Sequence, residues 1–151
     1  MKCIVITKKQ IMFYLSLFAA VVIVVGGSLG VYASANRLLP IYCVETDKKQ
    51  IAISFDAAWG NDDTQQLIDI LAEYKVPATF FVVGAWVDKY PESVKALHGA
   101  GHQIQNHSNT HPNMPQLSRE QMRNEIESCN KKIESVTGIC PTLFRPPYGD
   151  Y

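Results

Sequence analysis

The stretch from Gln50 to Gly84, QIAISFDAAWGNDDTQQLIDILAEYKVPATFFVVG, decides the fold class, because two short apolar runs flank an amphipathic one. The first run, residues 50–55, predicts a strand that ends at Asp56. Residues 62–75 predict a helix, because apolar side chains recur there at helical spacing, at Leu67, Ile68, Leu71 and Tyr74. Residues 78–84 are apolar enough to predict a second strand that is covered on both faces.

The same alternation continues along the chain. A second helix is predicted from near Pro91, a favoured first-turn residue, to Gly99 or Gly101. Residues 102–106, HQIQN, predict a third strand, although Ile104 is its one strongly apolar residue.

A third helix is predicted after residue 118. Ser118 and Gln121 form a capping-box pattern, and Gly138 is placed to end the helix. Its apolar residues make one stripe that predicts burial, at Met122, Ile126, Cys129, Ile133 and Val136. Residues 142–145, TLFR, then predict a fourth strand.

Alternating strands and helices with short links predict an α/β fold with parallel strands and helical crossovers. The carboxyl ends of parallel strands share one rim. Polar residues fall at those ends: Asp56 after the first strand, His107 after the third, and Arg145 with Tyr148 after the fourth. We therefore expect these residues to converge at a binding site.

The N-terminal part has a different character. Residues 11–33 contain no charge and are long enough to span a bilayer as a helix. Lys2, Lys8 and Lys9 precede them, which predicts a cytoplasmic segment 1–10, a signal anchor 11–33, a linker 34–49 and an exported domain 50–151. A competing interpretation is a secretory signal cleaved near Ala35, after the small residues ASA. Both interpretations place the folded domain outside the cytoplasm.

Composition narrows the class of partner. Beyond residue 35 the chain has 14 acidic and 11 basic residues, because Lys2, Lys8 and Lys9 come earlier. This acidic balance offers no electropositive groove, so nucleic-acid binding is not expected. Oligomeric state is not indicated. Cys129 and Cys140 are candidates for a disulfide, but burial on the helix stripe is the alternative for Cys129.

The chain has four histidines: two follow the predicted third strand, and two lie near the end of the second predicted helix. His107 and His111 can offer two imidazole nitrogens to a borderline metal such as zinc. The helical H-E-x-x-H pattern of zinc proteases is absent, since Ser108 follows the first histidine. His98 and His102 are expected at the surface.

Three segments resemble the motifs of a known family in order and spacing: SFDAAWG from Ser54, HSNTH from His107, and FRPPYG from Phe144. The chain from Gln50 to Tyr151 is identified as a member of the polysaccharide deacetylases, the NodB homology or carbohydrate esterase 4 family. FDAAWGND looks most like the sporulation branch of PdaB-like peptidoglycan deacetylases.

The resemblance implies a distorted (β/α) barrel that removes acetyl groups from N-acetylated sugars with a divalent metal, zinc or cobalt. It makes Asp56 the general base that accepts a proton from metal-bound water. His107 and His111 match the metal ligands. Arg145 matches the residue that holds the base, and Tyr148 the residue whose backbone N–H helps to bind the oxyanion.

Two departures from the family pattern bear on activity. The family has a second aspartate after the base as third metal ligand, where this chain has Ala57. Asp62 or Asp63 are candidates to replace it, although either also suits a helix cap. Secondly, the later family motifs have no counterpart before Tyr151, and four strands cannot close a barrel. We therefore expect half of a barrel, C-terminally truncated and inactive as it stands.

Three functions are consistent with the sequence. The first is an anchored, metal-dependent deacetylase of cell-wall or peptidoglycan amino sugars with a role in sporulation. The second is a wall-binding homologue that lost its metal ligand at Ala57. The third is an amidohydrolase of small cyclic amides.

Overall fold

The computed structural model of this chain describes residues 7–35 and 40–151, and within α1 (Lys8–Ala35) the side chains as far as Gly26. The chain divides into two compact units, Met1–Lys48 and Lys49–Tyr151. Much of the predicted cytoplasmic segment 1–10, and residues 36–39 of the predicted linker, lie outside the described residues.

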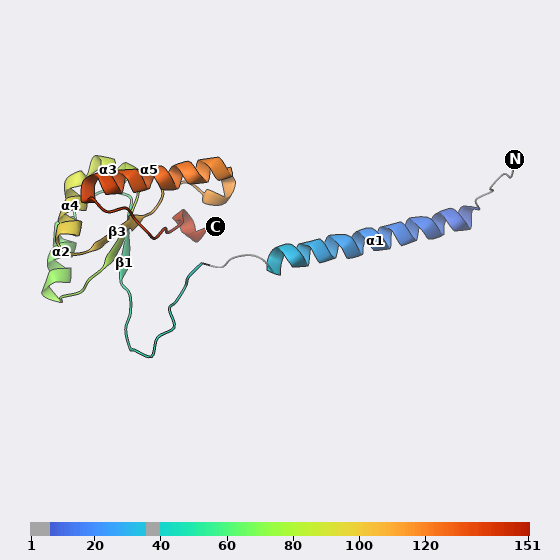
Figure 1. Cartoon of the computed structure of the whole chain (residues 1–151), viewed down its shortest axis with the longest axis horizontal. Helices are drawn as coiled ribbons and strands as arrows, with labels where there is room; N and C mark the ends of the chain where they lie inside the picture. Colours follow the sequence, from blue (N-terminus) through green and yellow to red (C-terminus); the bar gives the residue numbers. More distant parts are fainter. Residues whose placement is uncertain (1–6, 36–39) are drawn as a thin grey trace. The chain divides into compact units, whose positions relative to one another are not determined.

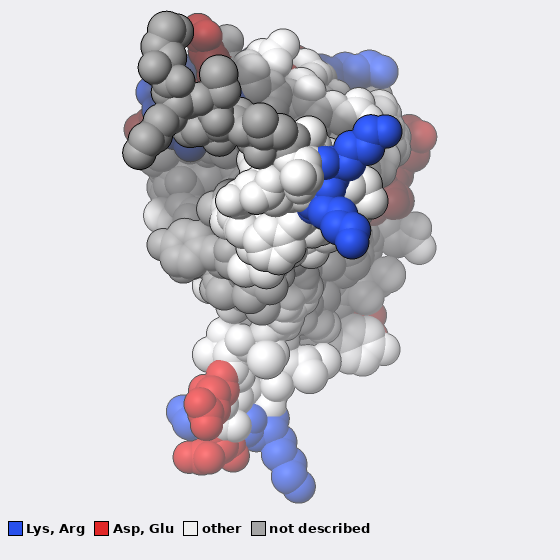
Figure 2. Space-filling view, turned by 90° about the vertical axis from the view of Figure 1, so that its right-hand side faces the viewer, with Lys and Arg blue, Asp and Glu red and all other residues white. Residues whose placement is uncertain are grey.

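The first unit contains the long helix α1 (Figure 1). By length and composition, Lys8–Gly26 within it can cross a membrane, and none of those side chains is buried. Lys8 and Lys9 begin the helix. Figure 2 shows Lys and Arg side chains, in blue, beside residues that are neither basic nor acidic, in white. The helix is consistent with a membrane anchor and equally with a signal sequence.

The second unit is an α/β arrangement of short strands and helices (Figure 1). In chain order its elements are β1 (Ser54–Ala57), α2 (Thr64–Glu73), β2 (Thr79–Val82), α3 (Gly84–Lys89), α4 (Pro91–Gly99), β3 (Gln103–Asn106), η1 (Met114–Gln116), α5 (Arg119–Thr137) and η2 (Pro147–Gly149). The predicted alternation of strand and helix is thus confirmed for three strands.

The strands form a parallel sheet in the order β1-β2-β3. Its two faces differ because successive side chains of a strand point to opposite sides. Phe80, Val82 and Ile104 belong to one buried cluster with residues of α2, α3, α4 and α5. On the other face Asp56, Phe81 and Gln105 form one row across the sheet. The face of the sheet that the helices cover holds the hydrophobic core. The row on the other face carries the polar side chains Asp56 and Gln105.

The sequence of α5 determines where the helix begins and ends. Ser118 accepts a hydrogen bond from the Gln121 N–H, the Gln121 side chain accepts from the Ser118 N–H, and Gly138 ends the helix with φ of 74°. The capping box and the glycine stop are therefore confirmed. Cys129 is fully buried and, like Cys140, is a free thiol, so the Cys129–Cys140 pairing did not form.

Three predictions about the elements were wrong in detail. β1 begins at Ser54 rather than residue 50, and Ile51 is exposed. The short helix α3 was missed, because the second strand was predicted to run to residue 84 and the next helix to begin near Pro91. The predicted fourth strand is reduced to one parallel bridge between Phe144 and Asn106.

Gln105 explains why the fourth strand is so short. Its side-chain Oε1 accepts from the backbone N–H groups of Thr142 (3.0 Å) and Leu143 (2.8 Å). A side-chain carbonyl thus replaces the backbone ladder there, and backbone pairing with β3 begins only at Asn106. Since the described sheet is open, the closed barrel stays a prediction.

Candidate active site

The residues expected at the rim meet around one cavity of about 300 Å³. Asp56 lies near the end of β1, His107 directly follows β3, and Arg145 follows the bridge at Phe144. The cavity is lined by Asp56, Ala58, Trp59, His107, His111, Arg145, Pro146, Tyr148 and Gly149. We call it the rim cavity.

Arg145 joins the strands at this rim. Its Nη1 donates to Asp56 Oδ1 (2.5 Å) and its Nη2 to Ser54 Oγ (2.6 Å). The guanidinium lies 4.0 Å from the ring centroid of Phe81, within cation–π range. A planar group with a fixed fork of donors suits this double contact. The Asp56 carboxylate is therefore oriented with Oδ1 on the arginine and Oδ2 turned toward His107.

The tautomer of His107 follows from its partner. Its Nδ1 lies 2.8 Å from the Arg145 carbonyl oxygen. A carbonyl can only accept, so Nδ1 carries the proton and Nε2 presents a lone pair. That Nε2 faces Asp56 Oδ2 across 4.0 Å. Burial lowers the pKa of His107 below 6.5, although the backbone hydrogen bond and Asp56 act in the opposite direction. The neutral ring is the form that binds metals.

His111 lies beside His107, with ring centroids 4.9 Å apart. Its ring also meets Trp59 (5.9 Å) and Tyr148 (4.9 Å) edge-on. The backbone N–H of His111 donates to Ser108 Oγ (3.0 Å), and its ring Nδ1 is a buried polar atom without a hydrogen-bond partner among the described residues. A buried imidazole nitrogen without a partner is an available ligand atom.

Tyr148 lies in η2 with φ of 60°. The hydrogen bonds of this turn run from Gly149 N to Pro146 O and from Asp150 N to Pro147 O, both 3.2 Å. The Tyr148 N–H takes part in neither of these two hydrogen bonds. Its side chain is largely exposed beside the rim cavity.

The residues present fit a divalent metal at two ligand positions. His107 and His111 offer imidazole nitrogens, which suit zinc and other borderline ions. In the chain as described, outside residues 1–6 and 36–39, no three His, Cys, Asp or Glu side chains form a metal-binding group. Zinc sites of enzymes normally have three protein ligands. The two histidines are thus suitable ligands for zinc, but they are one protein ligand fewer than the three that such sites normally have.

The candidates for a third ligand lie elsewhere. Asp62 and Asp63 do not line the rim cavity. Asp63 is the N-cap residue of α2 without a side-chain cap bond, and it lines a neighbouring cavity of about 130 Å³. Ala57 lines that neighbouring cavity too, whereas Ala58 lines the rim cavity.

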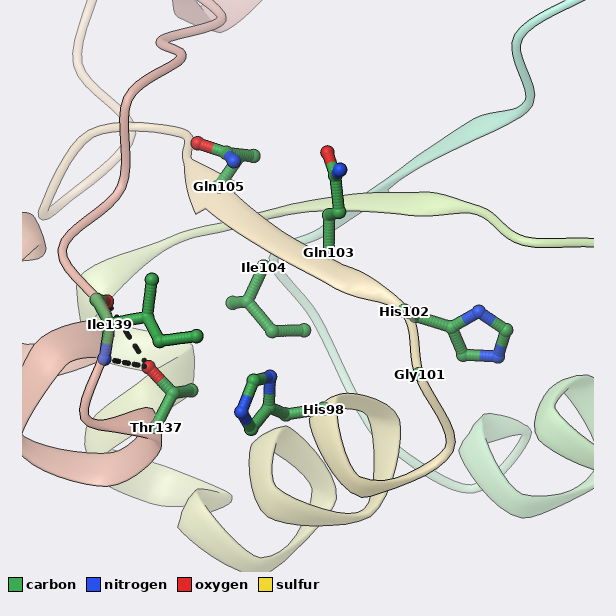
Figure 3. A pocket seen from close by; sticks show the side chains of 8 residues that line it. All are labelled: His98, Gly101, His102, Gln103, Ile104, Gln105, Thr137 and Ile139. Atoms are coloured by element: carbon green, nitrogen blue, oxygen red, sulfur yellow. Dashed lines mark hydrogen bonds between the residues drawn. The ribbon is translucent and has the colours of Figure 1, made fainter.

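A third cavity, of about 340 Å³, is lined by β3, by the residues before it and by the end of α5 (Figure 3). Its histidines, His98 and His102, point in opposite directions from the backbone near Gly101 (Figure 3). The expectation that His102 is at the surface was wrong, since it is 6% exposed. Its Nδ1 accepts from the Ala78 N–H (3.3 Å), and its ring lies against Phe80. Here His102 connects β3 to the start of β2.

Sequence reasoning missed Ser54 and Phe81 as supports of the site. Strand alternation was the available signal for Ser54, because it stands two residues before Asp56 and so shares its face. No comparable signal marked Phe81, because its place beside Asp56 depends on the register between β1 and β2.

Comparison with known proteins assigns the family. Residues 44–151 match the polysaccharide deacetylase family model, and the chain belongs to that family. It is 40% identical over 106 residues to the peptidoglycan-N-acetylmuramic acid deacetylase PdaC of Bacillus subtilis, covering 70% of this chain and 23% of PdaC. It is 36% identical over 112 residues to the uncharacterized protein YlxY of the same organism, covering 74% of this chain and 35% of YlxY.

Solved structures agree on the fold. The structure of PdaC superposes with a TM-score of 0.66 at 39% identity, covering 72% of this chain and 54% of that one. BA3943 from Bacillus anthracis, a CE4 family pseudoenzyme, gives 0.68 at 35% identity, covering 70% of this chain and 37% of that one. The three parallel strands thus match part of the carbohydrate esterase 4 fold, and the chain spans about half of these structures or less.

Proposed function

We propose that the protein is a metal-dependent hydrolase that removes N-acetyl groups from cell-wall amino sugars. The observation that carries this proposal is the convergence of Asp56, His107, His111 and Arg145 around the rim cavity. Deacetylases of peptidoglycan among the relatives support the substrate class. A link to sporulation and export through α1 belong to the same proposal.

Each residue has a role that its contacts permit. His107 and His111 hold the metal, which when bound polarises the amide carbonyl and lowers the pKa of a coordinated water. Asp56, held in position by the hydrogen bond from Arg145, accepts the proton of the attacking water. The Tyr148 N–H donates to the oxygen on which negative charge develops. Pro146 and Pro147 stiffen the turn that presents it.

Acetate release tests the proposal. The protein is purified in detergent and incubated with N-acetylglucosamine oligomers or peptidoglycan plus Zn²⁺ or Co²⁺. We expect released acetate, and we expect this release to be lost in His107→Ala. His98→Ala, which alters a histidine outside the rim cavity, is the matched control. Folded protein that releases no acetate with either metal would contradict the proposal.

A second candidate is a wall-binding homologue without turnover. Ala57 at the family's ligand position favours it, as does the similarity to a pseudoenzyme. A mutant of that pseudoenzyme has restored activity, and it superposes on this chain with a TM-score of 0.68. Metal analysis separates the candidates. Stoichiometric metal that disappears in His107→Ala supports the enzyme, whereas glycan binding without metal supports the binder.

A further inference from the structure

The segment from His107 to His111, here called the histidine loop, has a strained backbone. Ser108 has φ of 71° and His111 has φ of 61°, both in the left-handed region. Such a conformation costs a non-glycine residue of order 1–3 kcal/mol and persists only when neighbouring structure imposes it. The contacts that impose it come from two helices.

On one side, α3 holds the carbonyl groups of the loop. The N–H groups of Gly84 and Ala85 donate to the oxygens of Ser108 and Asn109, both at 2.9 Å. A Cβ at Gly84 would meet the Asn109 side chain and lie 3.1 Å from its Cα. Glycine therefore lets the loop approach the start of α3.

On the other side, Glu125 of α5 holds the N–H groups of the loop. Its Oε2 accepts from the backbone N–H groups of Asn109 and Thr110, both at 2.8 Å, and its Oε1 accepts from Thr110 Oγ1 at 2.8 Å. Successive N–H groups directed at one anion form a nest, which stabilises backbone of this kind. Charge-assisted bonds are stronger than neutral ones.

Asn106 supports the start of the loop in the same manner. Its Nδ2 donates to Ile126 O (2.8 Å) and Asn130 Oδ1 (2.6 Å) on α5, while its Oδ1 accepts from the Ser108 N–H (2.7 Å). The loop is thus attached to α5 at its start through Asn106 and in its middle through the charged carboxylate of Glu125.

We propose that Glu125 is a positioning residue that sets the spacing of His107 and His111, and through it the affinity of the pair for a divalent cation. This rests on the proposed function, in which the two imidazoles bind metal. Glu125 bonds to Asn109 and Thr110, the residues between the histidines, and has no described bond to either ring. Outer groups that orient ligands typically change metal affinity about 10–100-fold.

The test compares Glu125→Ala and Glu125→Gln with Glu127→Ala in the full chain. Glu127 is an exposed residue of the same helix whose side chain has no hydrogen bond or ion pair in the part of the chain described, so its replacement removes a charge without removing a described contact. Zinc affinity is measured by competition with a chromophoric chelator, and hydrogen exchange is followed at the Asn109 and Thr110 amides. The metal-free melting temperature is recorded as well.

We expect Glu125→Ala to weaken zinc binding about 10-fold or more and to remove protection at both amides. Glu125→Gln keeps an acceptor without the charge and is expected to lie between wild type and Glu125→Ala. Glu127→Ala is expected to match wild type. A lower melting temperature with unchanged zinc affinity would mean a merely structural role and overturn the proposal.

The proposal and the proposed function fail in different ways. If the wild-type chain binds no zinc, the metal-dependent function is contradicted, and exchange at Asn109 and Thr110 decides whether Glu125 holds the loop. If zinc binds but Glu125→Ala and the control Glu127→Ala behave alike in affinity and exchange, the positioning role is wrong and the metal site stands.

Discussion

Replacing Arg145 by lysine tests whether the fork of this side chain unites the rim. Lysine keeps the charge but has a single ammonium group, which cannot reproduce the paired contacts with Asp56 Oδ1 and Ser54 Oγ together with the planar contact on Phe81. The perturbation therefore removes geometry rather than charge.

The expected loss in the free energy of unfolding comes from those contacts. The hydrogen bond to Ser54 contributes about 0.5–1.5 kcal/mol, and the contact with Phe81 about 0.5–1 kcal/mol. The ion pair with Asp56 adds less than about 1 kcal/mol, because its side chains are 36% and 43% exposed and solvent screens the pair. Since lysine retains part of that pair, the free energy of unfolding should fall by about 1–2 kcal/mol.

Urea denaturation followed by tryptophan fluorescence measures this change in the unit that matters, because Trp59 and Trp86 both lie in Lys49–Tyr151. Arg123→Lys on the exposed side of α5 is the control, with an expected change within about 0.5 kcal/mol. Equal unfolding free energies for the two variants would refute the role assigned to the guanidinium fork.

Three further substitutions test other contacts of the domain. Asp56→Asn should leave folding nearly unchanged and lower acetate release at least about 100-fold; a variant that unfolds instead would make the carboxylate structural. Burial lowers the pKa of His102 below 6.5, because the buried ring is more stable without a charge. The neutral ring therefore contributes its full stabilisation of the fold above pH 6.5. This contribution declines as the pH falls below 6.5, by at most about 1.4 kcal/mol per pH unit. His102→Asn, which keeps an acceptor for the Ala78 N–H, should flatten that part of a stability–pH curve from urea titrations, and an unaltered slope would count against it. Gly84→Ala should cost about 1–3 kcal/mol of unfolding free energy by crowding the histidine loop, whereas Gly99→Ala, with open space around its Cβ position, should cost nothing in the same urea assay.

Local sequence determined the parts of this protein that depend on nearby residues. Helical spacing and the capping box of Ser118 and Gln121 predicted α5, and alternation of strand and helix predicted a parallel sheet with polar groups at one rim. These features follow from periodicity and capping, which involve residues a few positions apart.

Tertiary structure decided what depends on contacts between distant residues. Gln105 shortened the fourth strand by binding Thr142 and Leu143, and packing against Phe80 buried a histidine, His102, that the sequence placed at the surface. The bond from Arg145 to Ser54 joins residues separated by 91 positions. Such partners are chosen by chain topology, because parallel strands bring their carboxyl ends together whatever their separation in sequence. The histidine pair was visible in the sequence; what holds it in place was not.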